Sequence, residues 1–324
     1  MPDAMFIIAA KDLSDARRSG FVTTLSGFLI IAALTALIAG AVALHSDVAT
    51  YEAARAALLA LGKTAAQLKP PEFYPLRLLR GTIEQIEITG SAIAIVIGFQ
   101  AAAGERGRQT LGLILTRPVR RWHFAAGKML AGLGQLAAGL AALFIACALC
   151  LQIMSGVGLT LNDLLRLAVV WAAALPYTAC FLLLAFALTL RMRHTSTALL
   201  LTFALWLVLV LIAPQIGDTM DPDNQVAGGV FKALNIARPD QLRIMQSYAG
   251  FEKLRGGIEQ ASLTKHFERF SFAVLGIKST FTGLPLGPIL TEKALDLLWI
   301  VLAALGLGGA ALFLPLSPRT LAQE

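Results

Sequence analysis

The sequence has 324 residues, of which 57% are hydrophobic and only 15% are charged. Soluble domains carry about 25% charged residues, whereas here whole blocks of about 20 residues, enough to span a bilayer, carry almost no charge. The composition excludes a soluble globular enzyme, a disordered chain and a disulfide scaffold. The net charge of +7 does not indicate nucleic-acid binding, because Lys and Arg lie at the edges of apolar segments, where they orient membrane spans.

The apolar segments predict an all-α integral membrane protein with six transmembrane helices. An amphipathic helix in residues 1–20, with Phe6, Ala10, Leu13 and Arg17 at helical spacing, precedes them and is expected to lie on the membrane surface. The predicted spans cover residues 21–44, 86–103, 124–152, 164–190, 195–213 and 294–314.

The distribution of Lys and Arg predicts the orientation of these spans. The N-terminal helix, the segment 104–123, the turn 191–194 and the tail 315–324 carry Lys or Arg and share one side. Most of the other positive charges fall in two long segments, where charge has little effect on translocation. We therefore expect a multi-pass protein of the bacterial cytoplasmic (inner) membrane with both termini in the cytoplasm.

The two long outer segments, residues 45–85 and 214–293, are expected to contain helices. In the first, apolar residues from Tyr51 to Leu68 recur every three or four positions until Pro70. In the second, a similar stripe includes Phe267 and Phe270, and Pro239 is placed to begin another helix. Two interpretations stay open for this helical cap: a passive lid, or a docking surface for an extracytoplasmic protein through Pro239, Asp240 and Arg243.

The third predicted span carries one face of small residues. These residues recur every three or four positions, and they are Gly127, Ala131, Gly134, Ala138 and Ala142. Such faces let helices approach closely in lipid, so we expect this face to contact another span or a second copy of the chain.

The sequence contains no catalytic constellation. Its four histidines are far apart, no pair has metal-ligand spacing, and no P-loop motif is present. Cys147 and Cys150 form a C-x-x-C inside an apolar run, which favours a packed pair over a metal or redox site. Glu87 and Arg166 lie near span ends, where we expect them to reach the interface. Energy for any transport would therefore come from outside the chain.

The most informative segment is the first basic one. Gln109–Thr116 predicts a helix of one or two turns with Leu111, Ile114 and Leu115 on its apolar face, and Pro118 ends it. It is too apolar for a free loop and too short to cross the membrane. It could bind a groove in a partner, or lie on lipid with its arginines on anionic head groups.

This segment resembles the coupling region of ABC-2 type permeases. That pattern has an acidic residue after span 2, a Thr-Leu-x-x-Leu-Leu-type helix, a Pro followed by basic residues, and a Gly-Lys pair opening span 3. The matching positions are Glu105, Thr110, Leu111, Ile114, Leu115, Pro118, Arg120, Arg121, Gly127 and Lys128.

Further features extend the resemblance. The unit Ala9–Asp15 is similar to the interfacial helix of this family, and the six-span layout fits the whole chain. Within the family the chain most resembles the NosY-type permeases, which serve copper-site maturation of nitrous oxide reductase, both in this unit and in Arg238–Arg243. The outer segments look longer than in those permeases, and Gly107 and Arg108 replace a more acidic stretch.

The resemblance implies a non-catalytic permease that works as a homodimer with two copies of an ATP-binding subunit. ATP and Mg would be bound by that subunit, and this chain would hold no cofactor or metal. The implied activity is ATP-driven export, in support of metalloenzyme maturation. The alternative is a non-transport membrane scaffold that anchors an extracytoplasmic complex. A membrane enzyme is disfavoured, because the spans lack clustered polar residues.

Overall fold

The computed structural model describes residues 3–61, 74–107, 121–154, 158–219 and 249–313, together with positions 234, 236, 240, 243 and 244. Within these ranges the protein is helical and has no strand. Six of the described helices are long and apolar enough to cross a membrane, as the sequence predicts.

The six spans are formed by the following elements, some of them interrupted by short turns of a different helix type. Four spans are single helices: span 1 is α2 (Phe21–Ala60), span 3 is α6 (Arg121–Met154), span 4 is α7 (Leu161–Arg191) and span 6 is α15 (Ala294–Phe313). Span 2 consists of η2 (Pro75–Leu79), α3 (Arg80–Gln85), η3 (Ile86–Gly90) and α4 (Ser91–Gly107). Span 5 consists of α8 (Thr195–Trp206), η4 (Leu207–Ile212) and α9 (Ala213–Thr219).

The remaining helices lie at the ends of the bundle. The short helix α1 (Asp3–Ser19) precedes span 1, and α12 (Ala249–Ala261), α13 (Leu263–Val274), η6 (Ser279–Phe281) and α14 (Leu286–Glu292) precede span 6.

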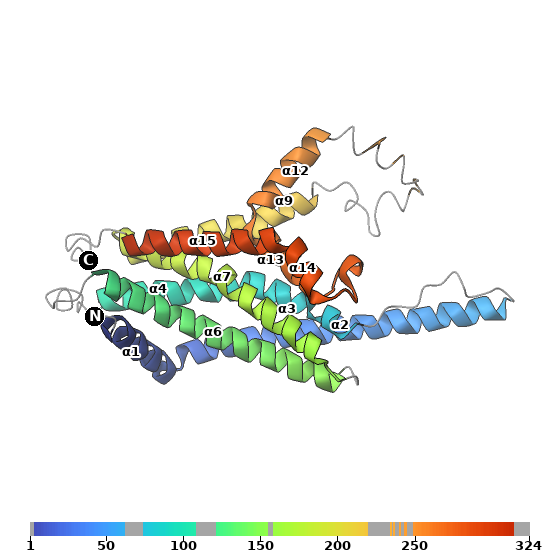
Figure 1. Ribbon diagram of the computed structural model, residues 1–324, viewed down its shortest axis with the longest axis horizontal. Coiled ribbons are helices and arrows are strands. Elements are labelled where there is room, and N and C mark those ends of the chain that lie inside the picture. The colour runs from blue at the N-terminus through green and yellow to red at the C-terminus, as the bar shows by residue number, and fades with distance from the viewer. Residues whose placement is uncertain are drawn as a thin grey trace.

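Two ends of the bundle can be distinguished in Figure 1. At one, called here the α1 end, lie α1, the last turns of α4, α7 and α15, and the first turns of α6 and α8. At the other, the α13 end, lie η2, α13, α14 and the protruding part of α2, while α9 and α12 project away from the bundle. All segments expected on the cytoplasmic side therefore either lie at the α1 end or connect to helices that end there.

Span 1 and the helix expected after it form one continuous helix. The sequence contains no Gly or Pro between Gly40 and Gly62, so nothing interrupts α2 between the predicted span and Ala60. Its N-terminal boundary is sharp, because Gly20 has a φ of 68° and breaks the helical path between α1 and α2.

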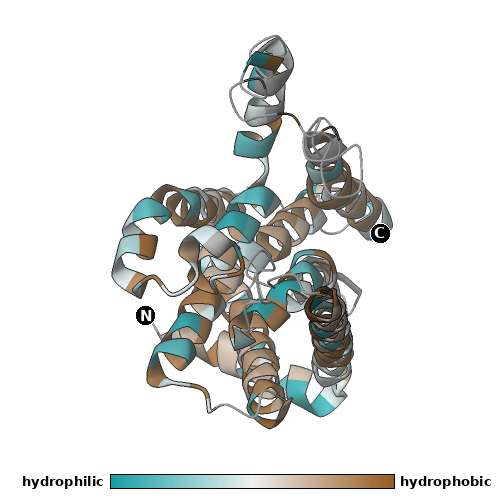
Figure 2. Ribbon diagram, turned by 90° about the vertical axis from the view of Figure 1, so that its right-hand side faces the viewer, coloured by the Kyte–Doolittle hydropathy of each residue, from teal (hydrophilic) through white to brown (hydrophobic). Residues whose placement is uncertain are grey.

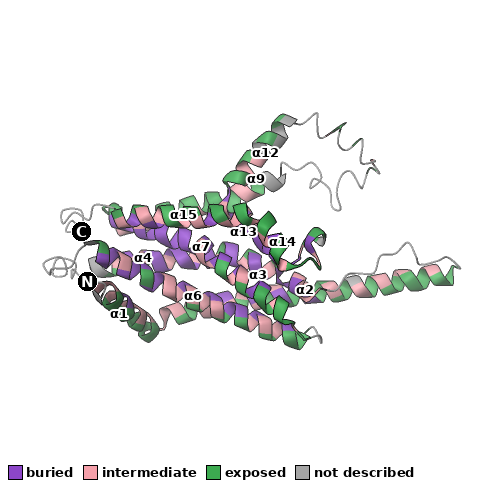
Figure 3. Ribbon diagram, viewed as in Figure 1, coloured by how far each residue is buried: buried purple, intermediate pink, exposed green. Residues whose placement is uncertain are grey.

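Spans 2 and 4 form the centre of the bundle. In their most apolar stretches 56% and 61% of residues are buried, against 17% in span 5 and 11% in span 6. Figure 3 shows this as a continuous buried zone along α4 and α7. The two helices meet at Gly98, where a Cβ atom would collide with the backbone carbonyl of Leu182. In the view along the bundle, hydrophobic residues occupy much of the packed helices (Figure 2).

Spans 2 and 5 each contain a π-helical turn, and the two turns contact one another. A π-turn leaves a carbonyl without its usual helical donor, and in lipid that carbonyl needs another partner. Here the Tyr177 hydroxyl donates to the carbonyl of Glu87 at 3.1 Å. Trp206 Nε1 donates to Ser91 Oγ at 2.7 Å, which joins span 5 to span 2. Side chains from two other spans thus stabilise the irregular turn in span 2.

Candidate functional site

The segment that carries the predicted coupling helix begins and ends at the α1 end. Its ends are fixed by Gly107, the last residue of α4, and Arg121, the first residue of α6. Of the predicted coupling residues, Thr110, Leu111, Ile114, Leu115, Pro118 and Arg120 lie outside the described residues. Glu105 lies in the last turn of α4, and for Glu105 and Arg121 only the backbone is described.

Beside this segment, α1 lies directly on α6. A Cβ atom on Gly127 would lie 2.8 Å from the carbonyl oxygen of Met5 and 3.0 Å from the side chain of Ile8, so only glycine permits this approach. In the next position, Lys128 Nζ forms an ion pair with Asp12 Oδ2 at 2.9 Å and lies 5.4 Å from the centre of the Phe124 ring. The Gly-Lys pair that opens span 3 therefore holds the surface helix in place.

The small-residue face of α6 divides into two parts. Gly127 and Ala131 are buried, and Gly127 lies under α1. Gly134 is half-buried, and a Cβ atom there would meet no described atom within 4 Å; Ala138 is exposed. The part of the face at Gly134 and Ala138 is thus available to another molecule, whereas α1 of the same chain covers the part at Gly127.

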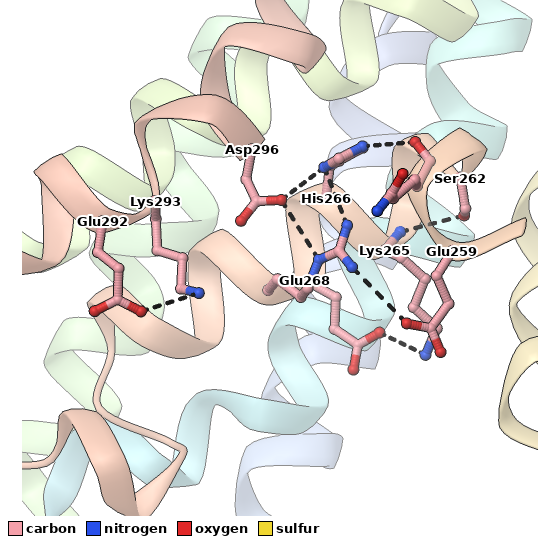
Figure 4. A network of polar contacts seen from close by, with 10 residues as sticks. Glu259, Ser262, Lys265, His266, Glu268, Glu292, Lys293 and Asp296 are labelled. Carbon is pink, nitrogen blue, oxygen red and sulfur yellow. Dashed lines mark hydrogen bonds and ion pairs between the residues drawn. The ribbon is translucent and has the colours of Figure 1, made fainter. Parts of the chain in front are cut away.

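At the α13 end, a group of charged side chains joins three helices (Figure 4). This outer cluster consists of Glu259 on α12, His266 and Arg269 on α13, and Asp296 on α15. His266 Nδ1 lies 2.6 Å from Asp296 Oδ1, and its Nε2 lies 2.9 Å from the Gln260 carbonyl oxygen. Arg269 Nε lies 3.4 Å from Asp296 Oδ1, and Arg269 Nη1 lies 3.8 Å from Glu259 Oε2. The cluster therefore ties α12 and α13 to span 6.

The apolar stripe of α13 turns into the bundle. Phe267, Phe270 and Val274 are fully buried, and the Phe267 ring stacks on Tyr177 of α7 with 4.6 Å between ring centres. The helix begins at Ser262, whose hydroxyl accepts a hydrogen bond from the backbone N–H of Lys265 at 3.3 Å. The part of the cap formed by α13 is thus integral to the fold.

The expectation that Arg166 and Glu87 extend to the interface was wrong. Arg166 is 1% exposed and donates to the carbonyl oxygen of Val274 at 2.6 Å and to that of Leu284. Glu87 is 7% exposed within the π-turn of span 2. Both side chains turn inward because α13 and the segment after it cover the positions where solvent was expected.

Tyr74 lies beside this buried arginine, just before span 2. Its hydroxyl donates to Asp163 Oδ1 at 3.4 Å, which connects η2 to the first turn of α7. Burial raises the pKa of Tyr74 above its ordinary value, and the nearby Arg166 only partly offsets this. Tyr74 therefore stays neutral and acts as a donor.

The residues predicted for partner docking are only partly described. Pro239 lies outside the described residues, and Asp240 and Arg243 are exposed. The sequence reading missed the roles of Arg166, His266 and Asp296. The sequence did contain a signal for each of them, because a charged or titratable side chain next to an apolar run needs a hydrogen-bond or ion-pair partner. The sequence does not indicate which residue is that partner.

At the α1 end, α1 is thus fixed on α6 close to the termini of α4 and α6 that bound residues 108–120. The described residues contain no cluster of three or more side chains able to hold a metal. A family model described as "ABC-2 family transporter protein" matches residues 6–313, from α1 to the last residue of α15. No curated protein matches the chain.

Proposed function

Because the chain belongs to the ABC-2 family of transporter proteins, we propose that it is the permease subunit of an ATP-binding-cassette exporter and that residues 109–116 couple it to the ATP-binding subunit. The family implies that the ATPase is a separate protein, so ATP and Mg are bound there. The observation that carries the proposal is the family match over nearly the whole chain, together with α4 and α6 delivering this segment to the end where α1 is anchored.

In this proposal the α1 end is cytoplasmic and the membrane is the bacterial inner membrane. Lys11, Arg17, Arg18, Arg191 and Arg193 support the orientation, since all lie at the α1 end. Reporter fusions test it directly. A fusion after His123 should read cytoplasmic, and fusions after Lys69 and Gln260 should read extracytoplasmic. A cytoplasmic signal at Gln260 would overturn the six-span orientation.

Coupling is tested by placing a charge on the apolar face of the segment. Leu111→Asp should abolish co-purification of the ATP-binding subunit while the chain still inserts into the membrane, because an unpaired charge in a packed contact costs several kcal/mol. Leu61→Asp is the matched control, since Leu61 is exposed at the opposite end. Normal co-purification and transport in Leu111→Asp would reject the coupling role and favour contact with lipid.

Glu105 separates assembly from coupling. It lies in the last turn of α4, where that helix passes into the coupling segment. Glu105→Ala should preserve most of the assembly but uncouple ATP hydrolysis from transport. Glu105→Asp, which keeps the charge, is the control. Loss of assembly in both variants would assign Glu105 to the contact itself.

We also propose that the permease is a homodimer with two ATP-binding subunits, and the open part of the α6 face supports this. Gly134→Leu adds a side chain where no described atom lies within 4 Å, so the fold of one copy should tolerate it. Dissociation of the dimer in mild detergent with an unchanged melting temperature of the monomer would indicate a second copy at this face. An unchanged dimer would place the interface elsewhere.

An extracytoplasmic protein, serving metalloenzyme maturation, is the proposed partner at the α13 end. The exposed Asp240 and Arg243 and the part of α2 beyond the bundle support this role. The same observations favour the second candidate function, a membrane scaffold without transport. ATP-driven export in proteoliposomes distinguishes the two, because a scaffold would bind its partner without ATP-dependent transport.

A further inference from the structure

A carboxyl group without a partner lies inside the bundle, toward the α13 end. Glu87 is 7% exposed, and its Oε1 atom is buried with no hydrogen-bond partner among the described residues. It belongs to the π-turn η3 of span 2, which contacts α2, α3, α4, α7 and the π-turn η4. A buried carboxyl group in this position costs free energy unless something binds to it.

The polar groups around this turn are already engaged with one another. The Tyr177 hydroxyl donates to the backbone carbonyl of Glu87 at 3.1 Å and lies 3.3 Å from Thr264 Oγ1. Ser91 Oγ donates to the same carbonyl and accepts a hydrogen bond from Trp206 Nε1 at 2.7 Å. These contacts join spans 2, 4 and 5 to α13, but they use the backbone of Glu87 and do not involve its carboxyl group.

The nearest charged side chains are paired with each other. Those that act most strongly on Glu87 are Glu268 and Lys265 of α13 and Glu84 of α3. Lys265 Nζ forms an ion pair with Glu268 Oε2 at 2.9 Å (Figure 4), and Arg80 Nε forms one with Glu84 Oε1 at 3.1 Å. Each of these two cations is thus matched by a carboxylate other than that of Glu87.

The described parts of the other elements around the turn add no cation. In α2 the residues 21–44 include no ionisable side chain, η4 has none, and those of α4 lie at the α1 end. On α7, Tyr177 and Cys180 are neutral donors, and Arg166 is eleven residues from Tyr177, about 16 Å along the helix. On α13, His266 and Arg269 turn toward span 6 (Figure 4).

An ionised Glu87 would therefore be an unpaired charge inside the bundle, whereas the neutral acid costs much less. A metal cation fits less well than a proton. Hard cations such as Mg²⁺ and Ca²⁺ need about six oxygen ligands, and the described residues contain no group of three or more His, Cys, Asp or Glu that could hold a metal. A proton needs only the carboxylate itself.

We propose that Glu87 is a proton-binding site, protonated while α13 is seated on the bundle, and that loss of this proton to water releases α13. The carboxylate left behind would attract Lys265 and repel Glu268, and so separate an ion pair that lies on α13. The same helix carries Thr264 and Phe267, which contact Tyr177. A charge on Glu87 therefore acts on the contacts that seat α13.

The direction of the pH effect follows from linkage. The seated form binds the proton and the released form does not, so the seated form is favoured as the pH falls and weakened as the pH rises. This proton site goes beyond the proposed permease function and does not depend on it.

Infrared spectroscopy of the purified permease alone in nanodiscs tests whether Glu87 carries a proton. A protonated carboxyl group has a C=O band that a carboxylate lacks. Glu87→Gln, which keeps the shape of the protonated acid, should lose the band of a single carboxyl group at neutral pH. Glu84→Gln is the matched control one turn earlier and should keep the band, because Glu84 is exposed and paired with Arg80.

Two outcomes of this measurement would overturn the proposal. An unchanged spectrum in Glu87→Gln would show that Glu87 is ionised. A band that disappears when sodium replaces potassium would show that a metal cation, and not a proton, occupies the site.

Hydrogen exchange tests the link to α13, with α7 as the internal reference for the direct effect of pH on exchange. From about pH 6 to about pH 9, the protection of α13 relative to α7 should fall about tenfold in the wild type, the effect of one linked proton over about one pH unit. The wild-type infrared band should decline over the same range, a comparison that needs no variant. Glu87→Gln should keep α13 protected throughout, and an equal fall in both proteins would overturn the link.

Both measurements use the permease without an ATP-binding subunit. A failure of the proton site therefore leaves the coupling test at Leu111 unaffected, and a failure of coupling leaves the infrared and exchange results unaffected.

Discussion

The two ends of the bundle are held together in different ways. At the α13 end, charged and polar side chains connect four helices: Arg166 of α7 binds carbonyls near α13 and α14, and the outer cluster joins α12 and α13 to α15. At the α1 end, the described contact between α1 and α6 combines one ion pair, Asp12–Lys128, with the close approach at Gly127.

This difference indicates where the bundle can change shape. Buried charges that each have a fixed partner resist rearrangement, because separating them leaves an unsatisfied group in an apolar environment. The described contact between α1 and α6 has one such pair, Asp12–Lys128, whereas the α13 end has both Arg166 and the outer cluster, so we expect α1 to move at lower cost. The end at which an ATP-binding subunit is proposed to act is thus the more adjustable one, and variants of both ends test this contrast.

The largest effect is expected for Arg166→Met. It removes the donor of the buried carbonyl of Val274 and of the partly buried carbonyl of Leu284, and should lower stability by about 3 kcal/mol. Thermal unfolding in detergent can be followed with a thiol-reactive dye, since Cys147 and Cys180 are buried until the bundle opens. Arg166→Lys, which keeps a charge and fewer donors, should fall between Met and wild type. A melting temperature equal to wild type in Arg166→Met would contradict the assigned role.

A smaller effect is expected for Asp296→Asn. The variant keeps the shape of the side chain but removes the carboxylate that faces His266 and Arg269. We expect a loss of about 1–2 kcal/mol and, below the melting temperature, faster hydrogen exchange in α13 than in α7. Exchange that accelerates equally in both helices would indicate general destabilisation and not release of α13.

At the α1 end, Asp12→Asn should cost about 1 kcal/mol, because the charge of the Asp12 carboxylate is lost while the amide oxygen can still accept a hydrogen bond from Lys128 Nζ, which also stays near the Phe124 ring. The expected result is local: trypsin should cleave faster at Lys11, Arg17 and Arg18, while the melting temperature stays nearly constant. If Asp12→Asn destabilised the protein as strongly as Arg166→Met, the two ends would not differ as described.

The smallest effect is expected for Arg80→Ala. Arg80 and Glu84 form an i, i+4 pair at 3.1 Å, with side chains 66% and 47% exposed. Such pairs contribute little, so the change in stability should stay within about 0.5 kcal/mol. Because Arg80 also lies toward the α13 end, this variant tests whether the exposure of a charged side chain, and not its position in the bundle, determines the change in stability.

The sequence predicted the six spans because membrane thickness imposes a length and a composition on each of them. It could not predict the π-turns at residues 86–90 and 207–212, because an added residue leaves an apolar run apolar. It also placed Arg166 and Glu87 at the interface, because sequence distance from a span end does not reveal that α13 covers that end. The residues that contact Gly127, Met5 and Ile8 of α1, are likewise far from it in the sequence, so the sequence could not predict this contact.

For the candidate site, the coupling segment stays a prediction, whereas the Gly-Lys pair after it is described and contacts α1. A cavity of about 460 Å³ beside this pair was not predictable, since it is formed by four helices, α1, α2, α4 and α6, from different parts of the chain. Helical spacing alone could have placed Asp12, Asp15 and Ser19 on one face of α1. What that face meets depends on how α4 and α6 cross above it.

The length of α2 has a mechanical consequence. At 1.5 Å per residue its 40 residues extend about 60 Å, twice the thickness of the hydrocarbon core. A rigid rod of that length, tilted by about 10° around its inner end, moves its tip sideways by about 10 Å. Because Ala33 and Leu37 of α2 are buried, such a tilt requires repacking within the bundle, and the long helix would carry that repacking beyond the bundle as a displacement large enough for another protein to sense.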